Sequence, residues 1–287
     1  MAHKIKEEFI SELLTGKLKY ILKYVQFDDT LDMELRGNKV IIYYRGGAIL
    51  TIIENTYALE AISKEYHKKT SLISPAVTNF EEYIQKAKHI IDVFVYREKN
   101  HLGEKDIQQQ IVKENNYSPN AKDTDYYIID IEYQDKGRFD IVAIRWDSKS
   151  NIRKLPKSFT PTITIFEVKQ GYSAISGESG MVSHIKDFDK FNQSNKVEEF
   201  KVDMIAVFKQ KRELGLIVDM EKYKEVKQVS QNIEFVFLLA NYKSQSSALS
   251  EAMNNIKDCK FVYANAMGYG LYDRNIINKE EFINLFV

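Results

Sequence analysis

Charged residues interrupt two apolar stretches in the second half of the chain, and both stretches otherwise read as buried strands. Glu167 and Lys169 lie in the stretch 162–169, and residues two apart in a β-strand project from the same face. Asp140 lies in the earlier stretch 139–146, with apolar neighbours on both sides. A carboxylate inside an apolar strand is costly unless it is paired or binds a metal ion. If the two strands are neighbours, Asp140, Glu167 and Lys169 converge on one spot.

These three side chains form a set that could cleave a phosphate ester. Two carboxylates provide the hard oxygen ligands that Mg²⁺ and Mn²⁺ prefer. A metal ion held there polarises a phosphate oxygen and lowers the pKa of a bound water. The adjacent lysine would orient that water or stabilise the negative charge that develops on the phosphate. The set therefore indicates metal-dependent hydrolysis, with Asp140 and Glu167 as metal ligands and Lys169 beside them.

The elements that must position these residues follow a regular order. Residue types and spacing predict a helix over 104–114, a strand over 126–133 and a hairpin turn at 135–137. The two strands that carry the charged residues follow, separated by a polar, basic loop over 147–161. The remaining expected elements are helices at 181–192 and near 198–213, a strand at 233–242, a helix at 248–256 and a strand at 261–266.

This arrangement resembles the PD-(D/E)XK nuclease superfamily, whose restriction-endonuclease-like fold has a helix, three strands, a helix and a further strand. The signature of that family is an acidic residue on the second strand and (D/E)-x-K on the third. Asp140 and Glu167-Val168-Lys169 match it. Phe139 stands where the family name has proline, and the resemblance covers roughly residues 101–245, about half of the chain.

The resemblance implies an α/β fold in which helices flank a mixed central sheet. It also implies that Asp140 and Glu167 hold Mg²⁺ or Mn²⁺ and that Lys169 positions the attacking water. Many members add a glutamate on the first core helix. Glu104 is the best match to that glutamate because it opens the helix before the first strand, and Glu114 is the reserve candidate.

Two residues beside the motif could contact a nucleic-acid backbone. A Gly/Ser-rich loop over 171–180 leads into a helix, and a helix N-terminus favours an anion, so Ser179 could contact a phosphate. Helix capping by Ser179 explains the sequence at least as well. Gln170, directly after Lys169, could contact the substrate or simply end the strand.

Basic residues elsewhere offer weaker signals for the same partner. Arg153 and Lys154 lie in the loop 147–161 and could grip a nucleic-acid backbone through charge, or remain solvated. Lys186 and His184 lie on the helix after the motif, where His184 could assist at the site or be a partly exposed helix residue.

Two further acidic residues alternate on the first core strand. Asp130 and Glu132 lie two positions apart, so they share a face. Each could be a third acidic ligand or a residue of the polar face of the strand. We favour the polar face for both.

Residues 1–100 are expected to form a separate α+β unit, and residues 101–287 the nuclease-like domain. Apolar residues from Phe9 to Val25 recur at helical spacing and predict one amphipathic helix. Strands are expected at 31–35, 40–45 and 48–53, and a helix at 79–98. No chemical motif is visible in this half, whose expected role is scaffolding, substrate selection or assembly.

The composition of the chain limits which classes of protein it can belong to. Lys plus Arg and Asp plus Glu are both 41, so the formal net charge is zero and lacks the basic excess common in nucleic-acid binders. Cys259 is the single cysteine, which excludes an internal disulfide and fits a reducing compartment. No apolar run approaches the roughly 20 residues that a membrane helix needs. We expect a cytoplasmic protein that does not bind membranes.

The expected function is a nuclease that acts on nucleic acid, with DNA as the first candidate. A second reading is a nuclease-fold module that binds nucleic acid or a protein partner without cleaving. A third is a structural protein whose interface is the N-terminal unit. A homodimer is compatible with each of them, and the sequence does not distinguish DNA from RNA.

Overall fold

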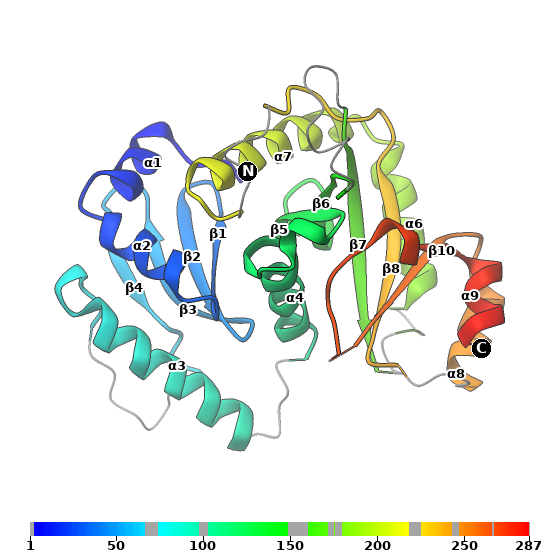
Figure 1. Cartoon of the computed structure of the whole chain (residues 1–287), viewed down its shortest axis with the longest axis horizontal. Helices are drawn as coiled ribbons and strands as arrows, with labels where there is room; N and C mark the ends of the chain where they lie inside the picture. Colours follow the sequence, from blue (N-terminus) through cyan, green and yellow to red (C-terminus); the bar gives the residue numbers. More distant parts are fainter. Residues whose placement is uncertain are drawn as a thin grey trace.

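The chain forms a mixed α/β structure with two β-sheets that lie side by side along its long axis (Figure 1). The computed structural model describes residues 3–66, 74–97, 103–148, 160–171, 175, 180–217, 225–242, 247–265 and 267–286. The α/β class is as expected.

The first sheet is antiparallel, with the strand order β1-β2-β3-β4. Its strands are β1 (Leu31–Leu35), β2 (Lys39–Tyr44), β3 (Gly47–Ile53) and β4 (Leu59–Ala61). Three of these strands were predicted, and β4 was not. Gly46, at the turn between β2 and β3, has a φ of +77° and lies so close to α4 that a Cβ there would be 2.7 Å from the carbonyl carbon of Lys105.

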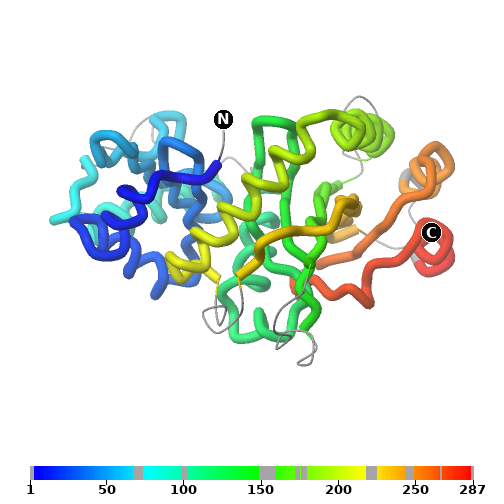
Figure 2. Tube along the Cα trace, turned by 90° about the horizontal axis from the view of Figure 1, so that it is seen from above, coloured from blue at the N-terminus to red at the C-terminus, as the bar shows by residue number. Residues whose placement is uncertain are grey.

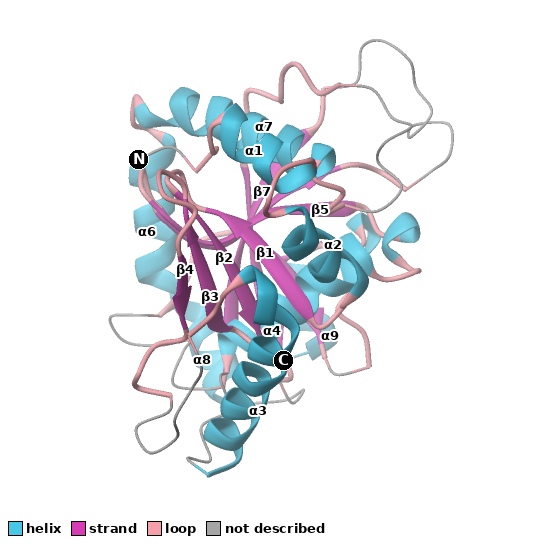
Figure 3. Ribbon diagram, turned by 90° about the vertical axis from the view of Figure 1, so that its left-hand side faces the viewer, coloured by secondary structure: helices cyan, strands magenta, loops and turns pink. Residues whose placement is uncertain are grey.

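Three helices pack with this sheet, and Figure 3 shows the molecule from the side of its N-terminal half. They are α1 (Glu7–Leu14), α2 (Lys19–Phe27) and α3 (Phe80–Arg97). The expectation of one helix from Phe9 to Val25 is wrong because the chain turns between α1 and α2. Gly16 is at this turn, where a Cβ would lie 2.3 Å from the Glu12 carboxylate, and glycine inside a helix costs about 1 kcal/mol relative to alanine.

The second sheet is mixed, with the strand order β10-β9-β8-β7-β6-β5. Its strands are β5 (Tyr126–Gln134), β6 (Arg138–Arg145), β7 (Thr162–Gln170), β8 (Glu234–Ala240), β9 (Lys260–Ala264) and β10 (Ile277–Asn278). Neighbours from β5 to β7 are antiparallel, whereas β7, β8 and β9 run parallel. β7 therefore lies inside the sheet, which explains its nearly unbroken apolar sequence.

Helices cover both faces of the second sheet. They are α4 (Glu104–Val112), α6 (Met181–Asn192), α7 (Lys196–Glu213), α8 (Ser247–Asn255) and α9 (Lys279–Phe286). Short turns of other helix types span Val77–Asn79, Lys113–Tyr117, Ala121–Asp123 and Asp273–Asn275. The helix expected over 104–114 ends at Val112 and continues as a π-helical turn. β10 and α9 were not predicted.

The two sheets share one hydrophobic core. Apolar side chains of α1, α2, α3 and the first sheet pack continuously with those of β5, β6 and α7. In Figure 2, α7 crosses from the second sheet to the N-terminal half. The expected division at residue 100 thus separates the elements of the two sheets, but their side chains meet in a common interior.

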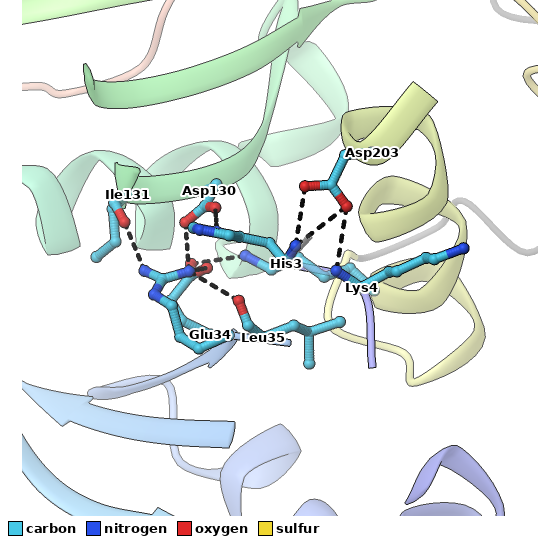
Figure 4. Close-up of polar contacts among 9 residues, drawn as sticks. His3, Lys4, Glu34, Leu35, Asp130, Ile131 and Asp203 are labelled. Carbon is cyan, nitrogen blue, oxygen red and sulfur yellow. Dashed lines mark hydrogen bonds and ion pairs between the residues drawn. The ribbon is translucent and has the colours of Figure 1, made fainter. Parts of the chain in front are cut away.

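Buried charges lie where the sheets meet. Lys211 of α7 binds Glu34 of β1 at 2.6 Å (Nζ to Oε1), and both side chains are fully buried. Asp130 of β5 is also fully buried and binds Arg36 and His3 (Figure 4). Neither reading of Asp130 weighed from the sequence is correct, because it is neither on a solvated polar face nor in the acidic cluster described below.

Among the described residues, no helix has both the length and the apolar character that crossing a membrane requires.

Replacing Lys211 with methionine should lower the free energy of unfolding by about 3–5 kcal/mol, because Glu34 would stay buried with only its longer contact to Arg36, at 3.4 Å. Urea denaturation measures the change. The matched control is Lys86→Met, which breaks an exposed pair with Glu82 and should change stability by about 0.5 kcal/mol or less. Equal effects of the two substitutions would contradict a structural role for the buried pair.

Candidate active site

β6 and β7 stop pairing where the charged residues begin. Their ladder ends at Ile141 and Phe166, and β7 continues from there in register with β8 alone. The N–H of Val168 donates to Oδ2 of Asp140 at 2.8 Å, so a side chain occupies the place of a strand carbonyl. The two strands therefore separate at this end of the sheet and leave room for polar side chains between them.

Glu167 and Lys169 lie together on β7, as their spacing predicted. Both are nearly buried, with 2% and 4% of their surface exposed. Nζ of Lys169 is 2.7 Å from Oε1 of Glu167, and Nδ1 of His184, on α6, is 2.8 Å from the same oxygen. Burial alone would raise the pKa of Glu167, but His184 and Lys169 hold it below its ordinary value. Glu167 is therefore a carboxylate that fixes the lysine in place.

A second group of carboxylates faces this pair. Glu104 opens α4, Glu132 lies on β5 and Asp140 lies on β6, and one oxygen from each is within 4.8 Å of the others. Burial, with the nearby charges of Glu167 and Glu104, raises the pKa of Asp140 well above its ordinary value. Burial also raises the pKa of Glu104, and Glu167 and Glu132 add to the increase. The group carries more negative charge than its surroundings neutralise.

The donor set suits a hard divalent cation. All three groups offer carboxylate oxygens, which Mg²⁺ and Mn²⁺ prefer, and the cluster contains no sulfur or imidazole ligand that would favour a softer metal. A cation would also offset the repulsion that raises the two pKa values. Glu104, Glu132 and Asp140 are thus the residues that could hold a metal, with Glu167 next to them.

The charged residues line a cleft of about 840 Å³. The residues of the two charged groups, together with His184, all belong to its lining: Glu104, Glu132, Asp140, Glu167, Lys169 and His184. Its lining also includes the exposed cations Arg138, Lys190 and Lys196. The cleft is large enough to admit a segment of a polymeric substrate, and cations and carboxylates meet inside it.

The structure places the two helix glutamates, Glu104 as first candidate and Glu114 in reserve, in different surroundings. Glu104 lies in the cleft. Glu114 lies in the π-helical turn after α4, where its Oε1 accepts a hydrogen bond from Asn120 Nδ2 at 3.2 Å. Glu104 is the helix carboxylate that geometry brings to Asp140.

The weaker sequence candidates lie at the edge of the site or beyond it. Gln170 ends β7 opposite Ala240 and lies outside the cleft lining, as does the exposed Lys186. Lys190, one turn further along α6, does line the cleft. Ser179, Arg153 and Lys154 lie outside the described residues.

For Glu132, a role as an acidic ligand was the less favoured of the two alternatives that the sequence offered. It joins the acidic cluster, although we favoured the polar face for it. The only signal in the sequence was an acidic residue on the strand that pairs with the one carrying Asp140. The backbone shift that places it there leaves no mark in residue spacing.

No family model, curated protein or solved structure matches the chain.

Asp140→Asn should stabilise the metal-free protein by an amount on the order of 1 kcal/mol, because each unit of pKa shift corresponds to about 1.4 kcal/mol. Asparagine keeps an oxygen for the Val168 N–H but removes the charge that Glu167 and Glu104 repel. A carboxyl whose pKa is raised by folding destabilises the fold progressively as pH rises above its unfolded value, about 4. The gain should therefore be absent near pH 3 and present at pH 7.

Urea denaturation in EDTA at both pH values checks this expectation. Asp123→Asn, which removes a carboxylate from the short turn before β5, serves as the control. An asparagine variant at position 140 that is less stable than wild type at pH 7 would contradict the repulsion inferred from the cluster.

Proposed function

We propose that the chain is a metal-dependent nuclease that hydrolyses phosphodiester bonds of nucleic acid, with DNA as the first substrate to test. The observation that carries the proposal is the convergence of Asp140, Glu167 and Lys169 with Glu104 and Glu132 in one cleft. The residues come from three strands and a helix, and they span positions 104 to 169 of the sequence. A solvated strand end would not bring them together.

The order of the elements supports a restriction-endonuclease-like core. A helix (α4), three antiparallel strands (β5, β6 and β7), a helix (α6) and a strand parallel to the third (β8) follow one another, with α7 added before β8. The acidic residue on β6 and the Glu-x-Lys on β7 lie where the PD-(D/E)XK pattern places them. The fold and the motif thus support the same proposal independently.

Each charged residue has a distinct task in this proposal. Asp140, Glu104 and Glu132 would hold Mg²⁺ or Mn²⁺, and Glu167 lies beside them. When bound, the metal would polarise the scissile phosphate and lower the pKa of a water molecule. Lys169, held by Glu167, would orient the attacking water or stabilise the negative charge that develops on the phosphate.

The rim of the cleft supports a polyanionic substrate. Arg138, Lys190 and Lys196 are exposed and line the cleft, so they would attract a phosphate backbone despite the zero net charge of the chain. Local charge, rather than total charge, would then guide binding.

Asp140→Asn and Lys169→Met should each reduce the cleavage rate by about 10²–10³-fold or more, because both remove groups that act on the transition state. The assay follows plasmid, linear duplex and single-stranded DNA with Mg²⁺ or Mn²⁺. Glu104→Gln should also be impaired, whereas the matched control Glu114→Gln, on the adjoining turn but outside the cleft, should cleave like wild type.

Full activity of Asp140→Asn would overturn the site. A folded wild type that binds DNA without cutting it under all these conditions would instead favour the alternative of an inactive binding module.

Lys190→Ala should weaken DNA binding and reduce the slope of log K against log salt concentration by about 0.7–0.9, the amount for one lost phosphate contact. Lys186→Ala, on the same helix but outside the cleft, is the matched control. Fluorescence anisotropy in EDTA measures binding without cleavage. Equal slopes for the two variants would show that the strand does not run along this side of the cleft.

A further inference from the structure

A bulge in β5 decides which residue faces Asp140. Ile128 pairs with Ala143, but Asp130 pairs with Val142, so the register shifts by one residue between them. Beyond the shift, Ile131 pairs with Ile141 and Tyr133 with Phe139. The intervening position, Glu132, is therefore opposite Asp140.

Without the bulge, the cleft would lose a carboxylate. The register of the first half of β5, if continued, would place Ile131 opposite Asp140 and Glu132 opposite Phe139. A one-residue slip exchanges the faces of all the side chains that follow it. The bulge is thus the feature that turns Glu132 from a neighbour of Phe139 into a neighbour of Asp140.

Glu132 is held in an uncommon backbone conformation. Its φ is +52°, in the left-handed region that non-glycine residues seldom adopt. Such a conformation persists only where surrounding contacts enforce it, and it recurs at functional sites. The Glu132 side chain is also fixed from α4, because Gln108 Nε2 donates to Oε1 at 2.9 Å.

Side chains of the N-terminal half contact the two residues that precede Glu132 (Figure 4). Arg36 directly follows β1. Its Nη1 donates a hydrogen bond to Oδ1 of Asp130, and its Nη2 donates one to the carbonyl of Ile131. His3 binds the second oxygen of Asp130 through Nδ1. Asp130, at the end of the register shift, and Ile131, the next residue, are therefore both bound by side chains from outside their own sheet, immediately before Glu132.

Further hydrogen bonds fix His3 and Arg36 in these positions. The backbone N–H of His3 donates to Asp203 of α7 at 2.8 Å. Arg36 also donates to the carbonyl of Leu35 at 2.9 Å. Both oxygens of the fully buried Asp130 carboxylate are thus engaged, one by Arg36 and the other by His3.

We propose that Arg36 and His3 are positioning residues of the active site, which fix the β5 bulge so that Glu132 lies opposite Asp140 and completes the metal-binding carboxylates. This inference rests on the proposed function in that the cleft binds a divalent cation. It assigns to the N-terminal half the task of shaping a metal site through the backbone of β5.

Mn²⁺ affinity of the full chain, measured by electron paramagnetic resonance titration without nucleic acid, tests the proposal. Glu132→Gln and Arg36→Gln should each lower the affinity by roughly 10- to 100-fold, the usual effect of losing a ligand's support. In the double variant, Arg36→Gln should cause no further loss, because it acts through Glu132. Arg36→Lys, which keeps the charge, should recover part of the affinity.

Two variants separate positioning from general destabilisation. Lys211→Met breaks a buried pair at the same junction but has no hydrogen bond to β5 and reaches Arg36 only through Glu34, so it should lower Mn²⁺ affinity less than the tenfold or greater loss of a supporting partner. His3→Ala removes one of the two side-chain contacts to Asp130 and keeps Arg36. It is the variant to titrate if Arg36→Gln does not fold. It should lower the affinity in wild type but not in Glu132→Gln. Thermal unfolding curves establish that each variant is folded at the titration temperature.

The possible results are distinguishable. Independent losses that multiply in the double variant, or a loss in Lys211→Met equal to that in Arg36→Gln, would overturn the positioning role. If Asp140→Asn abolishes Mn²⁺ binding while Glu132→Gln does not affect it, the inference fails and the proposed function stands. If wild type binds no Mn²⁺, or if Asp140→Asn leaves binding unchanged, the metal site of the proposed function fails together with this inference.

Discussion

The cost of removing a carboxylate from water governs both polar regions of this protein. A buried charge must meet an opposite charge, hydrogen-bond donors or a metal, or the fold loses stability. At the junction of the two sheets the charges find partners within the chain: Glu34 meets Lys211, and Asp130 meets Arg36 and His3. In the cleft, Glu104, Glu132, Asp140 and Glu167 surround Lys169, with His184 at the edge. The junction lies inside the shared core, whereas the carboxylates of the cleft line an open space that an added cation could enter.

This contrast indicates different roles for the two regions. A balanced group of buried charges fixes how elements pack, and its removal should mainly affect stability. An unbalanced group lowers stability and is retained where it serves another purpose, which is why shifted pKa values cluster at functional sites. Burial raises the pKa of Glu34 at the junction as well as those of Asp140 and Glu104 in the cleft, whereas neighbouring side chains lower the pKa of Asp130 and of Glu167. The distinction between the two regions therefore rests on access, because the junction is enclosed by the shared core and the cleft is open to a ligand.

Local pattern was enough to predict most of the second sheet and the core of the site. Apolar runs with a charged residue at a fixed position identified β6 and β7, and the period-two rule placed Glu167 beside Lys169. What spacing could not supply was the backbone irregularity of β5 and the break between α1 and α2. A bulge is one extra residue whose presence depends on contacts from elsewhere, and those contacts come from residues about a hundred positions away. Glu132 was ranked too low for that reason, and Asp130 was assigned to the wrong environment.

The N-terminal half showed no chemical motif because its proposed contribution to chemistry is indirect. β5 is the last strand of the second sheet, and an edge strand exposes unpaired carbonyl and N–H groups that must be covered. Arg36 donates to one of these groups, the carbonyl of Ile131. In other folds a further strand of the same sheet would take this place. A strand added there would impose a regular ladder and work against the left-handed residue at Glu132. A guanidinium satisfies the edge without imposing a register, so the bulge and the acidic residue that follows it can persist. If the cleft has the proposed function, the N-terminal half therefore contributes to it through side chains that bind β5, in place of a neighbouring strand.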